Sequence, residues 1–194
     1  MKRGAKKVVF EFLSIVIAVV LAMGLTEWRQ DILNHRQAEE SYQNIIEEIQ
    51  NNYNSLLPDS ANMVRSIQSI GDWLETSIDY RDTIEEMSYE LKLLSKSAWE
   101  VAKMNQSLTF IDNQRVLGAS IVYEFHDLYV TSGRDAFASL RDLQKVDNTS
   151  PEYVGEMKAL RVSLTLTYNA LRGYLEISRR LLNNPNPSSA SASE

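Results

Sequence analysis

The stretch VVLAMGLTEWRQDILNHRQ, residues 19–37, decides how this chain is built. In it an apolar run passes into a charged, helix-favouring sequence, with no Pro and a single Gly, Gly24, in between. Because Pro breaks helices and Gly weakens them, the stretch predicts one helix that continues out of the apolar run. The question it raises is whether the run anchors the chain or is a signal peptide that is removed.

The apolar run around this stretch has the length of a membrane-spanning helix. Val8 to Leu25 carries one charged side chain, Glu11. At 1.5 Å per residue the run spans roughly 27 Å, close to the thickness of the bilayer hydrocarbon. The preceding stub, MKRGAKK (residues 1–7), is basic and has no acidic residue. Basic flanks stay on the cytoplasmic side, so we expect a single-pass inner-membrane protein with a cytoplasmic N-terminus and a periplasmic body.

A cleaved signal peptide is the competing interpretation, because Ala22-Met23-Gly24 is an acceptable small-x-small cleavage site. Two features favour an anchor that is kept: no helix-breaking residue precedes this site, and a heptad stripe runs through it. Trp28 also follows the apolar core, where interfacial aromatic residues are common. The predicted stripe consists of Ala18, Leu21, Leu25, Trp28, Ile32, His35, Glu39, Tyr42, Ile46, Ile49, Tyr53 and Leu56.

The anchor contains candidate contacts with a partner helix. Ser14, Ala18, Ala22 and Thr26 recur every four residues. Small residues at this spacing let two helices approach closely, although they are common in any membrane helix. Glu11 lies about one turn inside the membrane, where it either reaches back to the cytoplasmic interface or pairs with a polar group of a partner.

Apolar residues at helical spacing predict that the body is an antiparallel bundle of about four long helices, so the fold class is all-α. The first helix should end at Leu57, because Pro58 cannot continue it. Asp59 should cap a second helix, and a capping box at Asp82 should start a third that runs to about Leu94.

The second half of the body contains clear helix boundaries. A capping box at Ser97 predicts a short helix, and a turn should follow at 107–112. A long helix is expected over 113–146, where Gly133 can bend or break it. Ser150 followed by Pro151 is a strong start for the last helix. The predicted organisation is therefore a cytoplasmic stub (1–7), a transmembrane helix (8–25), an extracytoplasmic bundle (26–182) and a disordered tail (183–194).

Composition excludes several kinds of protein. The chain has no Cys, so disulfides and Cys-ligated metals or haem are excluded. Outside the first 25 residues it keeps 16 of its 20 Lys and Arg and 25 of its 26 Asp and Glu, a net charge of −9. Such an acidic body is a poor partner for nucleic acid, which needs clustered basic residues.

The motifs of known catalytic and cofactor sites are absent. Neither of the two His residues belongs to the Glu-x-x-His motif of di-iron bundles, and there is no His-Glu-x-x-His, Gly-rich phosphate loop or Gly-x-Ser-x-Gly. We therefore predict no enzyme, no cofactor and no metal. Two polar spots remain. His35 and Glu39 share the predicted stripe, either at a partly solvated bundle end or as a polar pair that sets helix register. His126-Asp127 is either a core-edge pair or part of a ligand site.

Three segments suggest a family. EFLSIVIAVVLAMGLTEWRQD (11–31), with its Trp28-Arg29-Gln30 junction, YQNIIEEIQNN (42–52) and SAWEVAKMNQSLTFID (97–112) resemble small uncharacterised bacterial inner-membrane proteins. In that family a basic stub and an apolar helix lead through a W-x-[EQ] junction into a Glu-rich helix. The resemblance implies a single-span helical protein and names no catalytic residue.

The sequence thus favours a non-enzymatic interaction protein. It would be held in the lipid bilayer by one helix and would present a periplasmic bundle to other envelope proteins or to copies of itself. The alternative is a ligand-sensing four-helix bundle. With only seven residues on the cytoplasmic side, its signal would have to leave through the helix of a partner.

Overall fold

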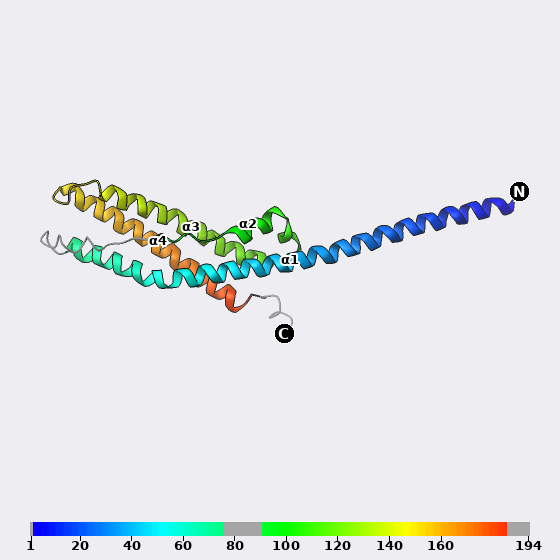
Figure 1. Cartoon of the computed structure of the whole chain (residues 1–194), viewed down its shortest axis with the longest axis horizontal. Coiled ribbons are helices and arrows are strands. Elements are labelled where there is room, and N and C mark those ends of the chain that lie inside the picture. The colour runs from blue at the N-terminus through cyan, green and yellow to red at the C-terminus, as the bar shows by residue number, and fades with distance from the viewer. Residues whose placement is uncertain (1, 76–90, 186–194) are drawn as a thin grey trace.

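A computed structural model describes residues 2–75 and 91–185, and within these ranges the chain forms helices and no strand. Figure 1 shows one helix much longer than the others, with the remaining elements gathered along its C-terminal half. The all-α class, with the N-terminal helix continuing into a helical bundle, is confirmed. The elements are α1 (Lys2–Glu75), α2 (Ser97–Met104), the 3₁₀ turn η2 (Ser107–Phe110), α3 (Asn113–Leu143) and α4 (Pro151–Asn183).

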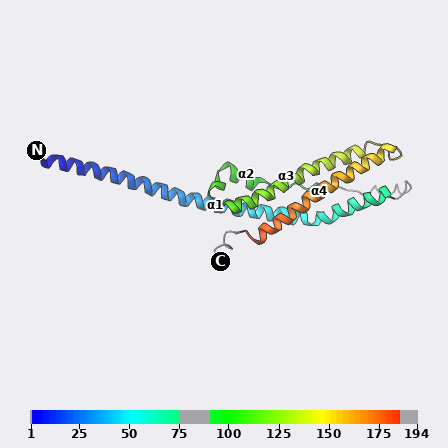
Figure 2. The same cartoon turned by 180° about the vertical axis from the view of Figure 1, so that it is seen from behind.

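The bundle alternates in direction. The segment after residue 90 descends along α1, since Ser95 pairs with Asn52 and Ser107 with Ser41. Next, α3 rises and α4 returns, and these two pack against each other along most of their length. Both cartoons show α4 lying beside the second half of α1 (Figures 1 and 2). The result is an up-down-up-down arrangement whose second leg contains the short helix α2.

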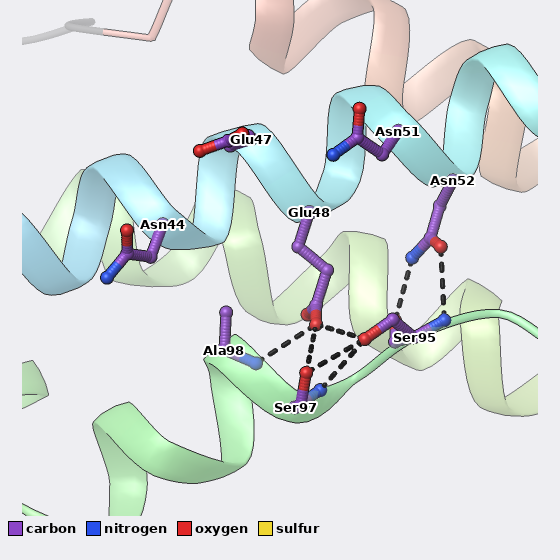
Figure 3. A pocket seen from close by; sticks show the side chains of 8 residues that line it. All are labelled: Asn44, Glu47, Glu48, Asn51, Asn52, Ser95, Ser97 and Ala98. Atoms are coloured by element: carbon purple, nitrogen blue, oxygen red, sulfur yellow. Dashed lines mark hydrogen bonds between the residues drawn. The ribbon is translucent and has the colours of Figure 1, made fainter.

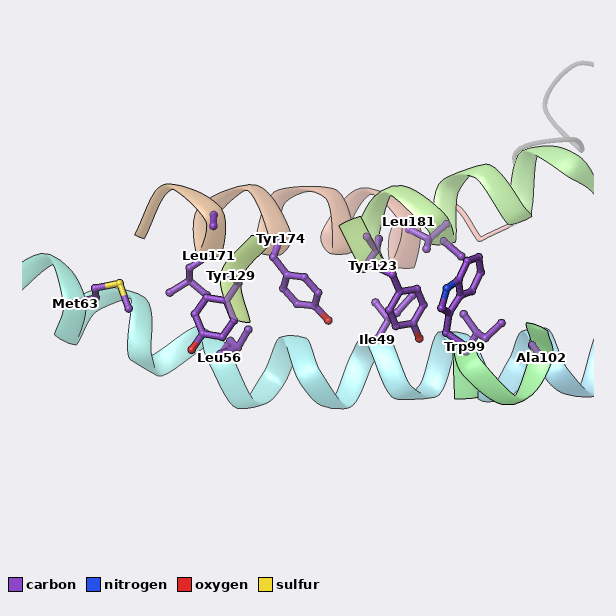
Figure 4. Packing of buried hydrophobic residues seen from close by; sticks show 14 residues of the cluster. Ile49, Leu56, Met63, Trp99, Ala102, Tyr123, Tyr129, Leu171, Tyr174 and Leu181 are labelled. Carbon is purple, nitrogen blue, oxygen red and sulfur yellow. The ribbon is translucent and has the colours of Figure 1, made fainter. Parts of the chain in front are cut away.

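A strict heptad pattern buries one face of α1 in the bundle. From Ala38 to Leu56 the buried side chains fall three and four residues apart, the spacing of a coiled-coil interface, and beyond Leu56 they fall seven apart. Figure 4 shows Ile49 and Leu56 of this face against residues of α3 and α4, with Trp99 of α2 and Tyr123 of α3 stacked beside them. The buried face of α1 consists of Ala38, Tyr42, Ile45, Ile49, Asn52, Leu56, Met63 and Ile70.

The predicted helix end at Pro58 is wrong. α1 continues through Pro58 to Glu75, and Asp59 caps no second helix but pairs with Lys92 at 3.1 Å. Pro in a helix interior costs about 3 kcal/mol. Burial of each large apolar side chain contributes about 1.5–3 kcal/mol, and Met63 and Ile70 continue the heptad beyond the proline. The cost appears as a change of direction between Leu56 and Met63 (Figure 4) rather than as a break.

The first part of α1 projects away from the bundle. We call residues 10–37 the stem. In Figures 1 and 2 it projects beyond the other elements, and only its end meets one of them, where the His35 ring contacts Phe110 of η2. Its apolar part is long and apolar enough to cross a membrane, and none of it is buried within the fold. Among the described residues this is the single helix that meets these criteria.

The predicted short helix does start at Ser97, but its capping box is not formed, because the N-cap is Lys96 without a side-chain capping bond and Ser97 Oγ donates to Glu48. The next two helices start where the sequence predicted. Asp112 caps α3 by accepting from the Gln114 and Arg115 amides, and Ser150 caps α4 ahead of Pro151. Gly133 does not break α3, which is continuous and buries this glycine. Most of the predicted third helix (82–90) lies outside the described residues, and its last part, 91–94, is not helical. The predicted tail lies outside the described residues from 186 onward.

Candidate functional site

The predicted contacts of the anchor all lie on the stem, outside the bundle. Glu11, Ser14, Ala18, Ala22 and Trp28 are exposed. Ser14 Oγ donates to the Phe10 carbonyl at 2.9 Å, so its hydroxyl is satisfied within its own helix. Their exposure leaves the whole of this face available to lipid or to another helix.

Of the two alternatives for His35 and Glu39, the structure agrees with the partly solvated bundle end and not with a polar pair. Their side chains are 59% and 50% exposed, and each has a different partner. His35 Nε2 lies 3.6 Å from Asp31 Oδ1, and its ring meets Phe110 edge-on. Glu39 Oε2 accepts from Arg115 of α3 at 2.7 Å. The hydrogen bond from Gln43, followed by the one from Arg115, holds the pKa of Glu39 below its usual value. The two residues therefore tie the base of the bundle to the stem and do not form a pair.

The structure instead concentrates buried polar groups around Glu48 of α1. Its carboxylate is the meeting point of three segments that are far apart in the sequence, and Figure 3 shows Ser95, Ser97 and Ala98 converging on it. Oε2 accepts from Ser95 Oγ at 2.5 Å, Ser97 Oγ at 2.9 Å and the Ala98 amide at 3.0 Å. Oε1 accepts from Tyr123 Oη of α3 at 2.6 Å. One carboxylate thus links α1, the start of α2 and α3.

Neighbouring residues complete this arrangement, which we call the Glu48 cluster (Glu48, Asn52, Ser95, Ser97 and Tyr123). Asn52 Nδ2 donates to the Ser95 carbonyl at 2.7 Å, and its Oδ1 accepts from the Ser95 amide at 3.1 Å. These two bonds give partners to the backbone N–H and C=O groups of Ser95, which lies in a segment without secondary structure of its own. The cluster therefore fixes the descending segment against α1.

The electrostatics of Glu48 follow from its position. The residue is 8% exposed, and burial alone raises the pKa of a carboxyl group. Here the hydrogen bonds from Ser95, Tyr123, Ala98 and Ser97 outweigh burial and hold the pKa of Glu48 below its usual value. Burial and the bond to Glu48 raise the pKa of Tyr123, so its hydroxyl stays a donor. The cluster is built around an ionised carboxylate.

The second polar spot predicted from the sequence lies beside this cluster. His126 is buried at 5% exposure, and its Nδ1 lies 3.0 Å from Asp127 Oδ1. Nε2 is 3.5 Å from the Leu94 carbonyl. Lys96 Nζ donates to Asp127 Oδ2 at 2.6 Å. Burial raises the pKa of Asp127, but the hydrogen bonds from Lys96 and His126 outweigh it and lower this pKa below its usual value. These contacts place His126 and Asp127 in the packing of the descending segment on α3.

A groove of about 310 Å³ opens beside the cluster, between α1 and the start of α2. Asn44, Glu47 and Asn51 line its outer wall, and Glu48 and Asn52 lie at its base (Figure 3). Ligand pockets are usually enclosed and mostly apolar, whereas this groove is open and polar. Within residues 2–75 and 91–185, no three His, Asp or Glu side chains are grouped so as to hold a metal ion.

Comparisons with family models, with curated proteins and with solved structures found no match to this chain.

Sequence reasoning missed the Glu48 cluster because its stripe was out of register. The predicted stripe placed Ile46 and Tyr53 on the buried face, whereas the structure buries Ile45 and Asn52 there. With the correct register, Asn52 stands out as a polar residue among apolar ones, a signal for a specific partner. Glu48 gives a weaker signal: in this register it lies beside the buried face and Glu47 on the opposite side, and the return of 95–98 completes its burial.

Proposed function

We propose that this chain is a membrane-anchored, non-enzymatic helical-bundle protein that mediates protein–protein interaction or self-association at the bacterial envelope. In this proposal residues 8–25 span the inner membrane, the N-terminus is cytoplasmic and the bundle is periplasmic. Its partners are the lipid bilayer and other membrane or periplasmic proteins, including copies of itself.

The observation that carries the proposal is the continuity of α1. One helix runs from Lys2 to Glu75 with no break at the junction between the apolar run and the bundle. A signal peptide that is removed has no need to form one rigid body with the domain behind it. An anchor that must hold a bundle at a set distance and angle from the membrane gains from such continuity.

The region between membrane and bundle supports the interaction half of the proposal. From Thr26 to Gln37 the stem is a single exposed helix of 12 residues, roughly 18 Å long. This segment continues as helix at both ends, and it carries exposed Trp28 and Ile32. A helix of this kind is stabilised when a partner covers its apolar side. The Glu48 groove does not favour a sensor, since it is open and its carboxylate is already bonded within the chain.

Fractionation of cells that express the tagged full-length chain tests the anchor. We expect the chain to stay in the membrane pellet through an alkaline wash, with its body accessible to protease only after the outer membrane is opened. The control is Val16→Arg/Val20→Arg, since each Arg near the centre of a span costs about 2.5–3.5 kcal/mol. Release of the unaltered chain by the wash, or a mature N-terminus near Leu25, would contradict the anchor.

Crosslinking in intact membranes followed by pull-down tests the interaction half. We expect the full-length chain to be recovered covalently joined to a second protein or to another copy. Recovery of monomer alone, from membranes in which the chain is correctly anchored, counts against it.

A further inference from the structure

The stem carries an apolar stripe that the bundle leaves uncovered. Leu21, Leu25, Trp28 and Ile32 are between 49% and 67% exposed. They are spaced four, three and four residues apart, which places them along one side of α1 at the heptad spacing of a helix pair. We call these four residues the stem stripe. Leu21 and Leu25 lie in the predicted span, Trp28 lies at the expected membrane interface and Ile32 lies one turn beyond it, so the lipid hydrocarbon does not cover the end of the stripe.

The stem stripe is not an extension of the bundle core. With 3.6 residues per turn, its centre is rotated by roughly 100° from the first buried residues of the bundle face, Ala38, Tyr42 and Ile45. The helices that cover the bundle face therefore lie about a quarter of a turn away from it. From Leu21 to Ile32 this side of α1 is left open for a helix from another chain, and it ends at His35, whose ring meets Phe110 of η2.

We infer that a second copy of this chain covers the stem stripe, so that two stems pair as a short parallel coiled coil that begins in the membrane. This inference rests on the proposed anchor, which makes two copies leave the same membrane in the same direction. In a parallel pair each stripe residue meets its own counterpart. Ile32 and Leu25 then occupy the a positions and Leu21 and Trp28 the d positions. Of these, Ile32 at a and Leu21 at d are the residue types that favour two strands.

Charges beside the stem stripe match this arrangement. With Leu25 and Ile32 at a, Asp31 falls at g and Arg36 at the following e position. In a parallel pair, g of one helix faces the next e of the other, so each copy contributes one Asp31–Arg36 ion pair. In the single chain these side chains make only exposed contacts, Asp31 with His35 at 3.6 Å and Arg36 with Glu40 at 3.2 Å. Exposed pairs are weak, so they are readily exchanged for contacts between copies.

The absence of Cys from the chain allows a direct test. Single Cys variants of the full-length protein are oxidised mildly in native membranes, and the disulfide-linked dimer is measured for each. The pairing predicts a several-fold higher yield at stripe positions than at the positions between them. Leu33 is the matched control for Ile32, since it is the next residue, apolar and 43% exposed, but points away from the stripe. The stripe variants are Leu25→Cys, Trp28→Cys and Ile32→Cys, and the control variants are Glu27→Cys, Gln30→Cys and Leu33→Cys.

Charge exchange separates a contact between copies from a contact within one copy. In the Ile32→Cys background, Asp31→Arg and Arg36→Asp should each lower the dimer yield, and the combined exchange should restore it. Within one chain the same exchange places like charges beside His35 and Glu40, so a role within the chain predicts no recovery.

Membrane retention is measured on the same samples, so that the two proposals can fail separately. A chain that stays in the membrane but gives no dimer, or equal yields at Ile32 and Leu33, would overturn the pairing and leave the anchor standing. A chain that is released from the membrane would overturn the anchor and the pairing with it.

Discussion

Replacing Glu48 with Ala tests whether the Glu48 cluster holds the bundle together. The substitution removes the acceptor of four hydrogen bonds. The largest loss falls on Tyr123, which is 2% exposed and would keep an unpaired buried hydroxyl, at a cost of about 1–3 kcal/mol. The serine hydroxyls face the open groove, where water replaces the carboxylate, so each contributes less than about 1 kcal/mol. We expect Glu48→Ala to lower the free energy of unfolding by about 2–4 kcal/mol.

The neighbouring Glu47 provides a matched control. It lies on the same turn of α1 but is exposed on the outer wall of the groove, so Glu47→Ala should change the free energy of unfolding by less than about 0.5 kcal/mol. The measurement is urea unfolding of the full chain in detergent, followed by the circular dichroism of the aromatic residues and of the helices. Equal effects of the two substitutions, or a Glu48→Ala chain as stable as the unaltered one, would refute the role given to the cluster.

A double-mutant cycle isolates the central bond. Tyr123→Phe removes the hydroxyl that donates to Glu48 Oε1. Because Glu48→Ala has already broken this bond, the double variant should be less destabilised than the sum of the two single changes. Strictly additive losses would mean that the tyrosine and the carboxylate act independently.

Two further predictions follow from the geometry. The folded-state pKa of Glu48 lies below its unfolded value. The stability that the Glu48 carboxylate contributes is therefore complete above about pH 4.3 and is lost as the pH falls through the folded pKa. Urea unfolding at several pH values should show the difference in free energy of unfolding between the native chain and Glu48→Ala narrowing in acid, and a difference that widens would contradict this prediction. Gly155→Ala, with nothing within 4 Å of the new methyl group, should raise stability by about 1 kcal/mol. Gly173→Ala, whose methyl group would lie 2.3 Å from the Phe125 ring, should lower the stability by about 1–3 kcal/mol. Thermal melting of the two glycine variants measures both changes, and stability changes of the same sign would contradict the packing described for these positions.

Sequence signals predicted best where the determining interaction is local. The start of α4 follows from Ser150 with Pro151, whose capping bond reaches only two residues along the chain. Pro58 misled the same reasoning, because its local cost is overcome by burial of Met63 and Ile70 against distant helices. A rule about one residue cannot weigh contacts that only the folded chain supplies.

The register of the buried face shows the same limit on a finer scale. Ile45 and Ile46 are adjacent and both apolar, so either fits a heptad stripe. The structure buries Ile45 completely and Ile46 in part, a choice made by the packing of α3 and α4. Glu48 lies beside the buried face in this register, and its burial is completed only by the return of Ser95 and Ser97.

The central claim is that one unbroken helix joins the membrane to the bundle, and a distance measured by electron spin resonance tests it most directly. Spin labels are attached at Met23→Cys and Glu47→Cys in the full-length chain expressed in cells, recovered from membranes and diluted with unlabelled protein. Along a continuous helix these positions are about 36 Å apart, and we expect a narrow distribution centred there. A broad or much shorter distribution, or a mature chain without a label at Met23, would contradict the account.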